Sequence, residues 1–445
     1  MSADDFPADG TAGGRPDTGR ERAAVPRRAW LLAGLTAALT CVLYGYSSGV
    51  VAGAQLYYTP RFDLSTGQQG FAVSSFLLGA VLSALTAGRI SDRIGRRRML
   101  LLGGLLFGAG LLACALAPGF GLFLAGRIVQ GLAAGIASAL VPVYLSEIAD
   151  AGNRGRMGLL NQLGLTLGLF LSYVVALVLS GSGDWRWMFG AGAVGVAVFL
   201  LLSPALRESP AWRRKPKAGE RSRTAGGDEP AAALSDLFTP AVRPALAIGV
   251  VLCALQQLCG INAVLYFAPT VIRTTGLSAS NSILYSVFIG ALNLVMTFVA
   301  ARLIDRWGRR PLLLLSVGGM LATLIPLGAC FVWDLSGQSV IALLCLLGYV
   351  AFFAIGAGPV ILLLVSELFP PGMRARGASL CMAVNWICNF LVNQFFLNLV
   401  HGIGEGQTFW LFGALCLLGL VFVARAVPET RGRTDTDIAR ALRGA

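Results

Sequence analysis

The sequence predicts an all-α membrane protein whose twelve transmembrane helices form two pseudo-symmetric bundles of six. Three observations lead to this prediction: an apolar composition, recurring apolar segments long enough to span a bilayer, and an internal repeat. Of the 445 residues, 56% are hydrophobic and 13% are charged, and the mean hydropathy is +0.72. A soluble globular protein is roughly a quarter charged. The composition therefore excludes an ordinary soluble domain.

The apolar segments have the length that a transmembrane helix needs, about 20 residues. The tenth segment is long enough to tilt or to contain a break. We expect spans at residues 29–50, 70–89, 99–117, 121–145, 158–180, 187–206, 244–267, 281–304, 311–333, 339–366, 376–400 and 408–427.

The net charge of +13 is concentrated in the tails and in every second predicted loop. The intervening loops contain Arg61, Arg186 and Arg273 as their basic residues. By the positive-inside rule both termini are cytoplasmic, which requires an even number of spans. This placement indicates membrane topology, so we expect the lipid bilayer as a partner and no nucleic acid.

Polar segments divide the chain into five parts. Residues 1–27 mix Asp and Arg with Gly and Pro, and they lack the apolar region and cleavage site of a secretory signal. We expect a disordered cytoplasmic tail there. The two bundles are predicted at 28–206 and 244–432, with a cytoplasmic linker at 207–243 between them and a second cytoplasmic tail at 433–445.

No pattern in the chain is typical of metal, cofactor or enzyme chemistry. The nine cysteines lie in predicted spans without CxxC or metal-ligand spacing, so we interpret them as small hydrophobic residues. The single histidine, His401, lies at a predicted outer loop and receives no role. We expect no cofactor, no metal and no enzymatic activity.

The two halves of the chain share motifs at nearly constant spacing. GRISDRIGRRR at 88–98 returns as ARLIDRWGRRP at 301–311, with Asp92 and Asp305 separated by 213 positions. The other repeated pairs are Glu147 with Glu367 and Arg154 with Arg374, both 220 positions apart, and Glu208 with Glu429, 221 positions apart. Ordered matches at one spacing indicate an internal duplication. Parallel repeats of six spans are typical of transporters that rock about a central site.

These motifs resemble those of the major facilitator superfamily and of its sugar porter family. The D-R-x-G-R-R loops after spans 2 and 8 are similar to the superfamily signature. The motifs similar to sugar porters are GRIVQGLAAG (126–135), PVYLSE…RG (142–155), RESP, QQLCGIN…Y, SELFPPGMR (366–374), NWICNF (385–390) and PETRG (428–432). The resemblance covers residues 28–432. It implies a secondary transporter that moves a monosaccharide (a hexose, pentose or related polyol) across the cytoplasmic membrane by alternating access, as a functional monomer.

The repeated charged motifs lie in predicted cytoplasmic loops, where Gly95 permits a tight turn. Arginines that only set topology are the alternative, but topology needs neither Asp92 nor Asp305. The resemblance implies a cytoplasmic latch that pairs in the outward-open state and separates in the inward-open state. Its expected members are Asp92, Arg93, Arg96, Glu147, Arg154, Asp305, Arg306, Arg309, Glu367 and Arg374, together with the regions of Glu208 and Glu429.

The stretch QQLCGINAVLYFAP at 256–269 places three amides in an apolar span. A buried amide in hydrocarbon costs several kcal/mol unless it is hydrogen-bonded. On a straight helix Gln257 and Asn262 would point about 140° apart. They can therefore face one site only if span 7 bends at Gly260. For each amide, hydrogen bonding between helices is the alternative to a ligand site.

A side-chain amide both donates and accepts hydrogen bonds, as vicinal sugar hydroxyls do, and an indole offers a flat apolar face. Many sugar porters have Trp in a G-P-x-x-W motif where this chain has Leu362, so the identity of the sugar stays open. A polyol, an inositol or a drug in the same fold, and a non-transporting sugar receptor, are the alternatives. The resemblance places Gln162, Gln256, Gln257, Asn262, Asn293, Asn385 and Trp386 at sugar-contacting positions.

Coupling to protons needs a titratable group inside a span. Proton-coupled sugar porters typically carry Asp in a G-Y-D stretch of span 1, near the Arg of span 4. Here Ser47 occupies that place while Arg127 remains, held in our interpretation by carbonyls and Gln130. We therefore expect facilitated diffusion, with proton symport through Glu147 or another acid as the alternative.

Overall fold

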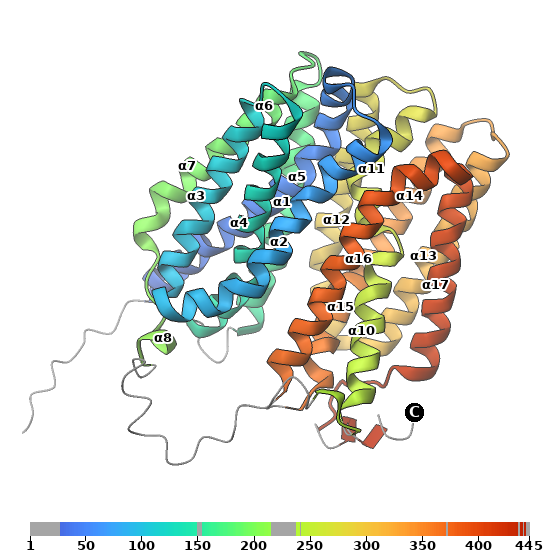
Figure 1. Cartoon of the computed structure of the whole chain (residues 1–445). Helices are drawn as coiled ribbons and strands as arrows, with labels where there is room; N and C mark the ends of the chain where they lie inside the picture. Colours follow the sequence, from blue (N-terminus) through green and yellow to red (C-terminus); the bar gives the residue numbers. More distant parts are fainter. Residues whose placement is uncertain are drawn as a thin grey trace, which may run out of the picture.

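The computed structural model describes residues 27–148, 154–214, 237–240, 242–370, 373–434, 437–438 and 440–441. The regular structure of these residues is helical throughout. Twelve of the described helical segments are long and apolar enough to cross a membrane. They are arranged as two bundles side by side (Figure 1). The predicted fold class is thereby confirmed.

The N-terminal bundle contains six spans, the last of which is divided into two helices. Its main packing contacts join α2 to α4, α1 to α5, and α3 to α4. The helices are α1 (Arg27–Phe62), α2 (Thr66–Ile94), α3 (Arg96–Ala115), α4 (Phe120–Ile148), α5 (Arg154–Leu179), α6 (Trp185–Gly190) and α7 (Gly192–Leu202), followed by the 3-10 helix η2 (Ser203–Ala205) and the short α8 (Pro210–Arg214).

The C-terminal bundle also contains six spans. In this bundle α13 packs against α17 and α14, and α10 packs against α16. Between the bundles, α16 faces α2 and α12 faces α5. The helices are α10 (Arg243–Leu258), α11 (Ile261–Thr274), α12 (Ala279–Trp307), α13 (Arg309–Val332), α14 (Gln338–Ile355), α15 (Ala357–Leu368), α16 (Arg374–Ile403) and α17 (Glu405–Ala426).

Spans 7 and 10 are each broken at a glycine. Gly260, between α10 and α11, has a left-handed backbone with φ +90°, a conformation that favours glycine. This confirms the bend predicted in span 7. In span 10 the break lies at Gly356, and Ser316 bridges it: its hydroxyl donates to the carbonyl of Phe352 (2.7 Å) and accepts from the amide N–H of Ala357 (2.8 Å). Both breaks lie in the same bundle.

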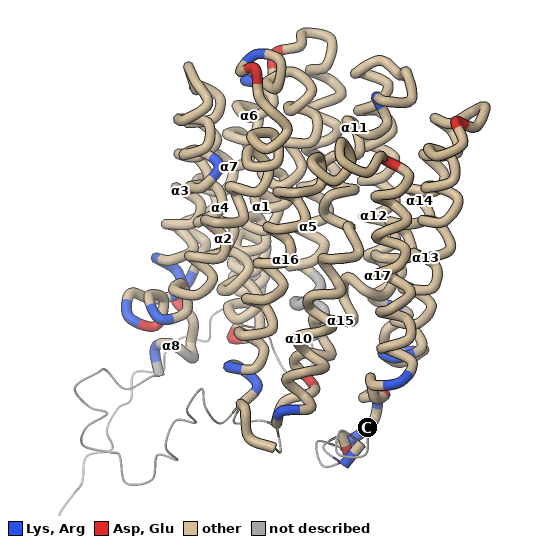
Figure 2. Tube along the Cα trace, turned by 45° about the vertical axis from the view of Figure 1, so that its right-hand side comes forward, with Lys and Arg blue, Asp and Glu red and all other residues tan. Residues whose placement is uncertain are grey.

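Basic residues gather at one end of the molecule, near α8 and the start of α10 (Figure 2). We call this end the basic end; it includes Arg96 at the start of α3 and Arg309 at the start of α13. The opposite end includes the turn between α1 and α2, around Asp63.

The bundles are joined by hydrogen bonds on the half of the spans toward the opposite end. The side-chain amide of Gln55 on α1 donates to the carbonyl of Tyr266 on α11 (2.7 Å). The hydroxyl of Tyr173 on α5 donates to the carbonyl of Leu265 (2.7 Å). The polar contacts seen among the described residues at the basic end each lie within one bundle. The structure is therefore closed at the opposite end.

Helices α2 and α16 approach each other closely at this closed end. Gln394 accepts a hydrogen bond from the hydroxyl of Ser74 (2.8 Å) and donates to the carbonyl of Gly67 (3.1 Å). A Cβ atom at Gly70 would lie far inside van der Waals contact with the backbone carbonyl of Gln394. The absence of a side chain at Gly70 is thus a condition for closure.

We expect Gly70→Trp to hold the opposite end open, because an indole cannot fit against the backbone of Gln394. Gln55→Cys, at a position that is 4% exposed here, reports this opening. In detergent, a water-soluble maleimide should label it about tenfold faster when Gly70→Trp is also present. Gly88→Trp is the matched control, since Gly88 lies on the same helix and a Cβ added there would have open space within 4 Å. Equal labelling in both variants would contradict the prediction.

Candidate functional site

Four side-chain amides of the C-terminal bundle form one continuous chain of hydrogen bonds. Asn262 donates to the Oε1 of Gln257 (2.7 Å), and Gln257 donates to the Oδ1 of Asn385 (3.1 Å). Asn385 donates in turn to the Oε1 of Gln256 (2.7 Å) and to the carbonyl of Cys253 (3.0 Å). The bend at Gly260 is what allows Gln257 and Asn262 to meet, as predicted. We call these four residues the amide chain.

The amide chain connects the breaks of spans 7 and 10. Gln256 donates from Nε2 to the carbonyls of Ala357 (2.8 Å) and Gly358 (2.9 Å), the first residues of α15. Gln256, Gln257 and Asn385 are buried, whereas Asn262 is partly exposed. Hydrogen bonds in a region of low dielectric constant polarise one another, so removing one member weakens the rest. The accessible member of the amide chain is Asn262.

A cluster of aromatic residues from both bundles includes Trp386, the residue that follows Asn385 of the amide chain. Trp386 follows Asn385 on α16, and its ring centroid is 6.4 Å from that of Tyr44 on α1. Tyr44 in turn stacks on Phe76 of α2, with centroids 6.0 Å apart. Such rings offer a flat apolar surface. Tyr44 was not among the predicted site residues, although it lies three residues before Ser47 in span 1.

Gln162 and Asn293 are not part of the amide chain. They lie on α5 and α12, which belong to different bundles and pack against each other. Gln162 is half-buried and Asn293 is buried. Their side chains form no hydrogen bond with other residues of the described chain, so both amides are available to water or to a ligand. The hydrogen bonds thus unite four of the seven predicted residues, with Trp386 adjacent.

Arg127 is buried in the N-terminal bundle, without a carboxylate partner in the described part of the chain. Its Nη1 donates to the carbonyl of Ser47 (2.6 Å) and to the Oε1 of Gln130 (3.1 Å), and its Nε donates to the carbonyl of Ala72 (3.4 Å). The guanidinium also lies 4.8 Å from the ring centroid of Phe76. The expectation that carbonyls and Gln130 hold Arg127 is confirmed. The hydroxyl of Ser47 is buried and unpartnered.

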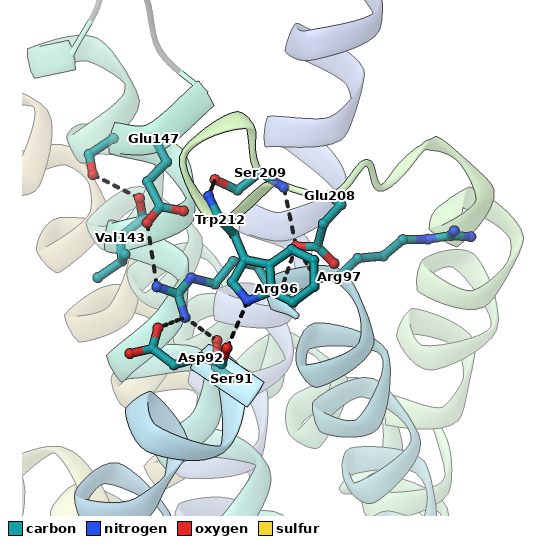
Figure 3. A network of polar contacts seen from close by, with 10 residues as sticks. Ser91, Asp92, Arg96, Arg97, Val143, Glu147, Glu208, Ser209 and Trp212 are labelled. Carbon is teal, nitrogen blue, oxygen red and sulfur yellow. Dashed lines mark hydrogen bonds and ion pairs between the residues drawn. The ribbon is translucent and has the colours of Figure 1, made fainter. Parts of the chain in front are cut away.

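At the basic end of the N-terminal bundle, Arg96 is the centre of a polar network (Figure 3). Its guanidinium pairs with Asp92 (2.7 Å) and Glu147 (3.5 Å), and it donates to the hydroxyl of Ser91 (2.6 Å). The indole N–H of Trp212 donates to the carbonyl of Asp92 (3.0 Å). The network therefore ties α2, α3, α4 and α8 together.

The C-terminal bundle repeats this arrangement. Arg309 pairs with Glu367 at 3.0 Å, and the hydroxyl of Thr430 donates to the other oxygen of Glu367 (2.5 Å). The pair corresponds to Arg96 with Glu147 in the sequence repeat. The duplicated motifs thus have duplicated geometry.

A carboxylate also caps the first helix after each repeated glycine turn. Glu208 accepts from the backbone N–H of Arg96 (2.8 Å), and Glu429 accepts from the backbone N–H groups of Arg309 and Arg310 (both 3.0 Å). Negative charge at a helix N-terminus is stabilising. A Cβ at Gly95, whose φ is +101°, would clash with Glu208. The turn and the cap therefore depend on each other.

The structure gives the contacts of only some of the remaining latch residues. Arg93 is exposed, and Arg374 at the start of α16 donates to the carbonyl of Phe369 (2.9 Å). The backbone carbonyl of Arg306 accepts from Arg431. The side chains of Arg154 and Asp305 lie outside the described residues. Arg96 with Glu147 and Arg309 with Glu367 are paired within their own bundles here. The expected latch, which pairs in the outward-open state and separates in the inward-open state, stays a prediction.

The sequence and the fold of this chain are similar to those of known sugar transporters. The family model described as "Sugar (and other) transporter" matches residues 33–228 and 217–442. The chain is 35% identical to the D-xylose transporter of Levilactobacillus brevis, over 91% of this chain and 94% of that protein. It is 33% identical to the galactose–proton symporter of Escherichia coli K12, over 91% and 93%. Its fold matches the inward-open xylose transporter XylE of E. coli with a TM-score of 0.79 and 29% identity, over 92% and 99%.

Glu429 should contribute stability that depends on pH. Burial by itself raises the pKa of Glu429, but backbone N–H donors of Arg431, Arg309, Arg310 and Thr430 outweigh it and lower this pKa below its ordinary value of 4.5. A lowered folded-state pKa stabilises the fold above the unfolded-state pKa, and this stability is lost as the pH falls through the folded-state value. We expect Glu429→Gln to lower the Tm by about 1–3 °C at pH 7.

The difference in Tm between Glu429→Gln and the unchanged protein should narrow as the pH falls below 4.5, the ordinary carboxyl value. Thermal unfolding in detergent across this range measures it. A difference that stays constant with pH would show that the substitution removes packing and not charge.

Proposed function

Because this chain belongs to the family of sugar transporters, we propose that the amide chain is its sugar site and that transport occurs by facilitated diffusion. The protein moves a sugar across a membrane. The observation that carries the site assignment is the continuous hydrogen-bonded chain from Gln256 to Asn262, located where two spans are broken. Broken helices near the midplane are where transporters of this architecture bind their substrates.

The chemistry of the amide chain suits a neutral polyhydroxylated ligand. Each amide supplies donors and an acceptor, which match the mixed pattern of sugar hydroxyls. Asn262 supplies the accessible end, and Trp386 with Tyr44 supplies the apolar surface for the C–H face of the ring. Gln162 and Asn293, which make no hydrogen bond with other described side chains, are available from the facing pair of helices. No charged partner is required in such a site.

The basic end is cytoplasmic in our proposal, in accordance with the positive-inside rule. This places both termini and the linker in the cytoplasm and the protein in the cytoplasmic membrane. The closed opposite end is then the outer end, so the structure is the inward-facing state of an alternating-access cycle. Its fold likeness to a transporter solved in an inward-open conformation supports this proposal.

Each bundle can move as a unit in this cycle. The networks around Arg96 and Arg309 tie the helices of one bundle to each other and leave the other bundle free. The contacts that must break are those at the outer end, above all Gln55 with Tyr266 and Gln394 with Ser74. Members of the latch that pair across the bundles would form as these outer contacts open.

Facilitated diffusion is favoured by the surroundings of Arg127. Two carbonyls and Gln130 accept its hydrogen bonds, and the span-1 position beside it is Ser47, which does not titrate in the working range. Proton symport is the second candidate function, and one observation favours it. Glu147 is the acid named for this alternative, and one of its carboxylate oxygens is buried without a hydrogen-bond partner among the described residues.

We expect Gln257→Ala to raise the KM for sugar by about tenfold or more, because a buried ligand hydroxyl would lose its partner and the amide chain would be interrupted. Uptake of radiolabelled hexoses, pentoses and inositols into proteoliposomes gives the KM and the preferred sugar. Asn281→Ala is the control, since Asn281 is an exposed amide at the start of α12. An unchanged KM in Gln257→Ala would remove the amide chain as the sugar site.

We expect sugar transport by the unchanged protein to move no protons, because the span-1 carboxylate is absent. A sugar gradient imposed on proteoliposomes that contain a pH-sensitive dye measures this directly. Ser47→Asp should introduce a pH dependence of uptake, since it places a titratable group beside Arg127. Ser47→Asn is the uncharged control. Sugar-driven proton influx in the unchanged protein would contradict facilitated diffusion and support symport.

A further inference from the structure

A cavity lined by both polar and apolar residues lies between the bundles at the closed end. It has a volume of about 550 Å³, within the range of about 300–1,000 Å³ that small-molecule sites occupy. Helices α1 and α2 with the turn between them form one side, and the end of α11 forms the other. The cavity therefore exists only when the bundles meet at this end. It does not include any member of the amide chain.

The polar lining of this cavity is suited to a neutral ligand. Asp63 and Arg273 both line it, so its formal charges cancel. The other polar groups are amides and hydroxyls, including Gln69 and Thr274. Leu56 and the other apolar residues of the lining offer a surface for C–H groups. An anion or a cation would meet one attracting and one repelling charge here, whereas a neutral polyol can form hydrogen bonds with both groups.

Two groups in the lining have unused hydrogen-bonding capacity. The hydroxyl of Thr270 is buried and has no hydrogen-bond partner. Leaving a buried hydroxyl unpaired costs free energy, so this group marks a place for a ligand or water. Gln55 is buried as well, and both of its hydrogen bonds use Nε2, which leaves its Oε1 to accept from a ligand. The cavity thus offers a hydroxyl group and an acceptor oxygen that have no hydrogen-bond partner among the described residues.

A stripe of polar residues on α11 runs from this cavity to the amide chain. Asn262, Tyr266, Thr270 and Thr274 are spaced four residues apart, so each lies about 40° further round the helix than the one before it, and together they form a stripe that winds slowly around α11. Asn262 belongs to the amide chain, and Thr270 and Thr274 line the cavity. Tyr266 lies between them, where its carbonyl accepts from Gln55. The same helix therefore carries two polar sites that are separated by one contact between the bundles.

We propose that this cavity is an outer docking site for a neutral sugar, distinct from the amide chain and occupied while the outer end is closed. The inference rests on the proposed orientation, in which the opposite end faces the outside. A sugar held here lies above the contact of Gln55 with Tyr266 and is already on the transport path when that contact opens. The site thereby raises the local concentration of sugar at the closed gate.

Protection of a cysteine from chemical labelling tests this docking site. Thr274→Cys places a thiol in the lining, and Thr275→Cys is the matched control, because Thr275 is its neighbour but hydrogen-bonds to Ser339 outside the cavity. A membrane-impermeant maleimide is applied to the outside of intact cells, with D-glucose or D-xylose as the probe. The chain without either substitution gives the background from its own cysteines. We expect sugar to slow labelling of Thr274→Cys several-fold and to leave Thr275→Cys unchanged.

A second set of variants distinguishes the docking site from the amide chain. With Gln257→Ala also present, the protection of Thr274→Cys should persist, because the cavity does not use the amide chain. Adding Thr270→Val should raise the sugar concentration needed for protection several-fold, since its hydroxyl is the unpaired group. Protection that disappears with Gln257→Ala, or that is equal at both cysteines, would overturn the docking site while leaving the amide chain as the sugar site. Labelling of both cysteines from the cytoplasmic side alone would overturn the proposed orientation and the outer placement with it.

Discussion

A side-chain amide in the apolar interior of a membrane protein must be hydrogen-bonded, and this requirement organises the C-terminal bundle. Where water does not reach such a group, an unpaired amide costs several kcal/mol. Gln257 finds Asn262 only because Gly260 takes a left-handed conformation. The amide chain then continues through Asn385 and Gln256 to the first residues of α15, next to the break in span 10. The bends in spans 7 and 10 and the polar site are thus parts of one arrangement.

Charged side chains must also be paired or hydrogen-bonded when they are buried. The protein meets this requirement in one way at the basic end and in another way inside the N-terminal bundle. At the basic end, carboxylates and guanidinium groups pair within a bundle, and Glu208 and Glu429 cap helices whose N-termini carry partial positive charge. Within the N-terminal bundle, Arg127 is held by carbonyl oxygens and Gln130 without an acid. A cation can therefore be retained in a span without creating a proton-binding partner beside it.

The two polar sites on α11 lie one after the other along the proposed route of the sugar. The amide chain lies at the break of the helix, and the outer cavity lies near its end, with Tyr266 between them. Both sites combine amides or hydroxyls with an apolar surface, which is the chemistry of a polyhydroxylated ligand. Leu362 is 41% exposed on α15 where many sugar porters have Trp, and in the proposed site the apolar surface comes from Trp386 and Tyr44.

The sequence by itself determined the twelve spans, the duplication, the bend in span 7 and the surroundings expected for Arg127, whereas for span 10 it left a tilt and a break as alternatives. These features depend on the length of apolar runs, on the backbone freedom of Gly260 and on the residue types near one position, all of which are local. Only the tertiary structure decided which amides meet. It joined Gln257 to Asn385, left Gln162 outside the amide chain and brought Tyr44 close to Trp386. The reason is that helix packing and the relative tilt of the two bundles bring together residues whose spacing in the sequence does not encode their contact.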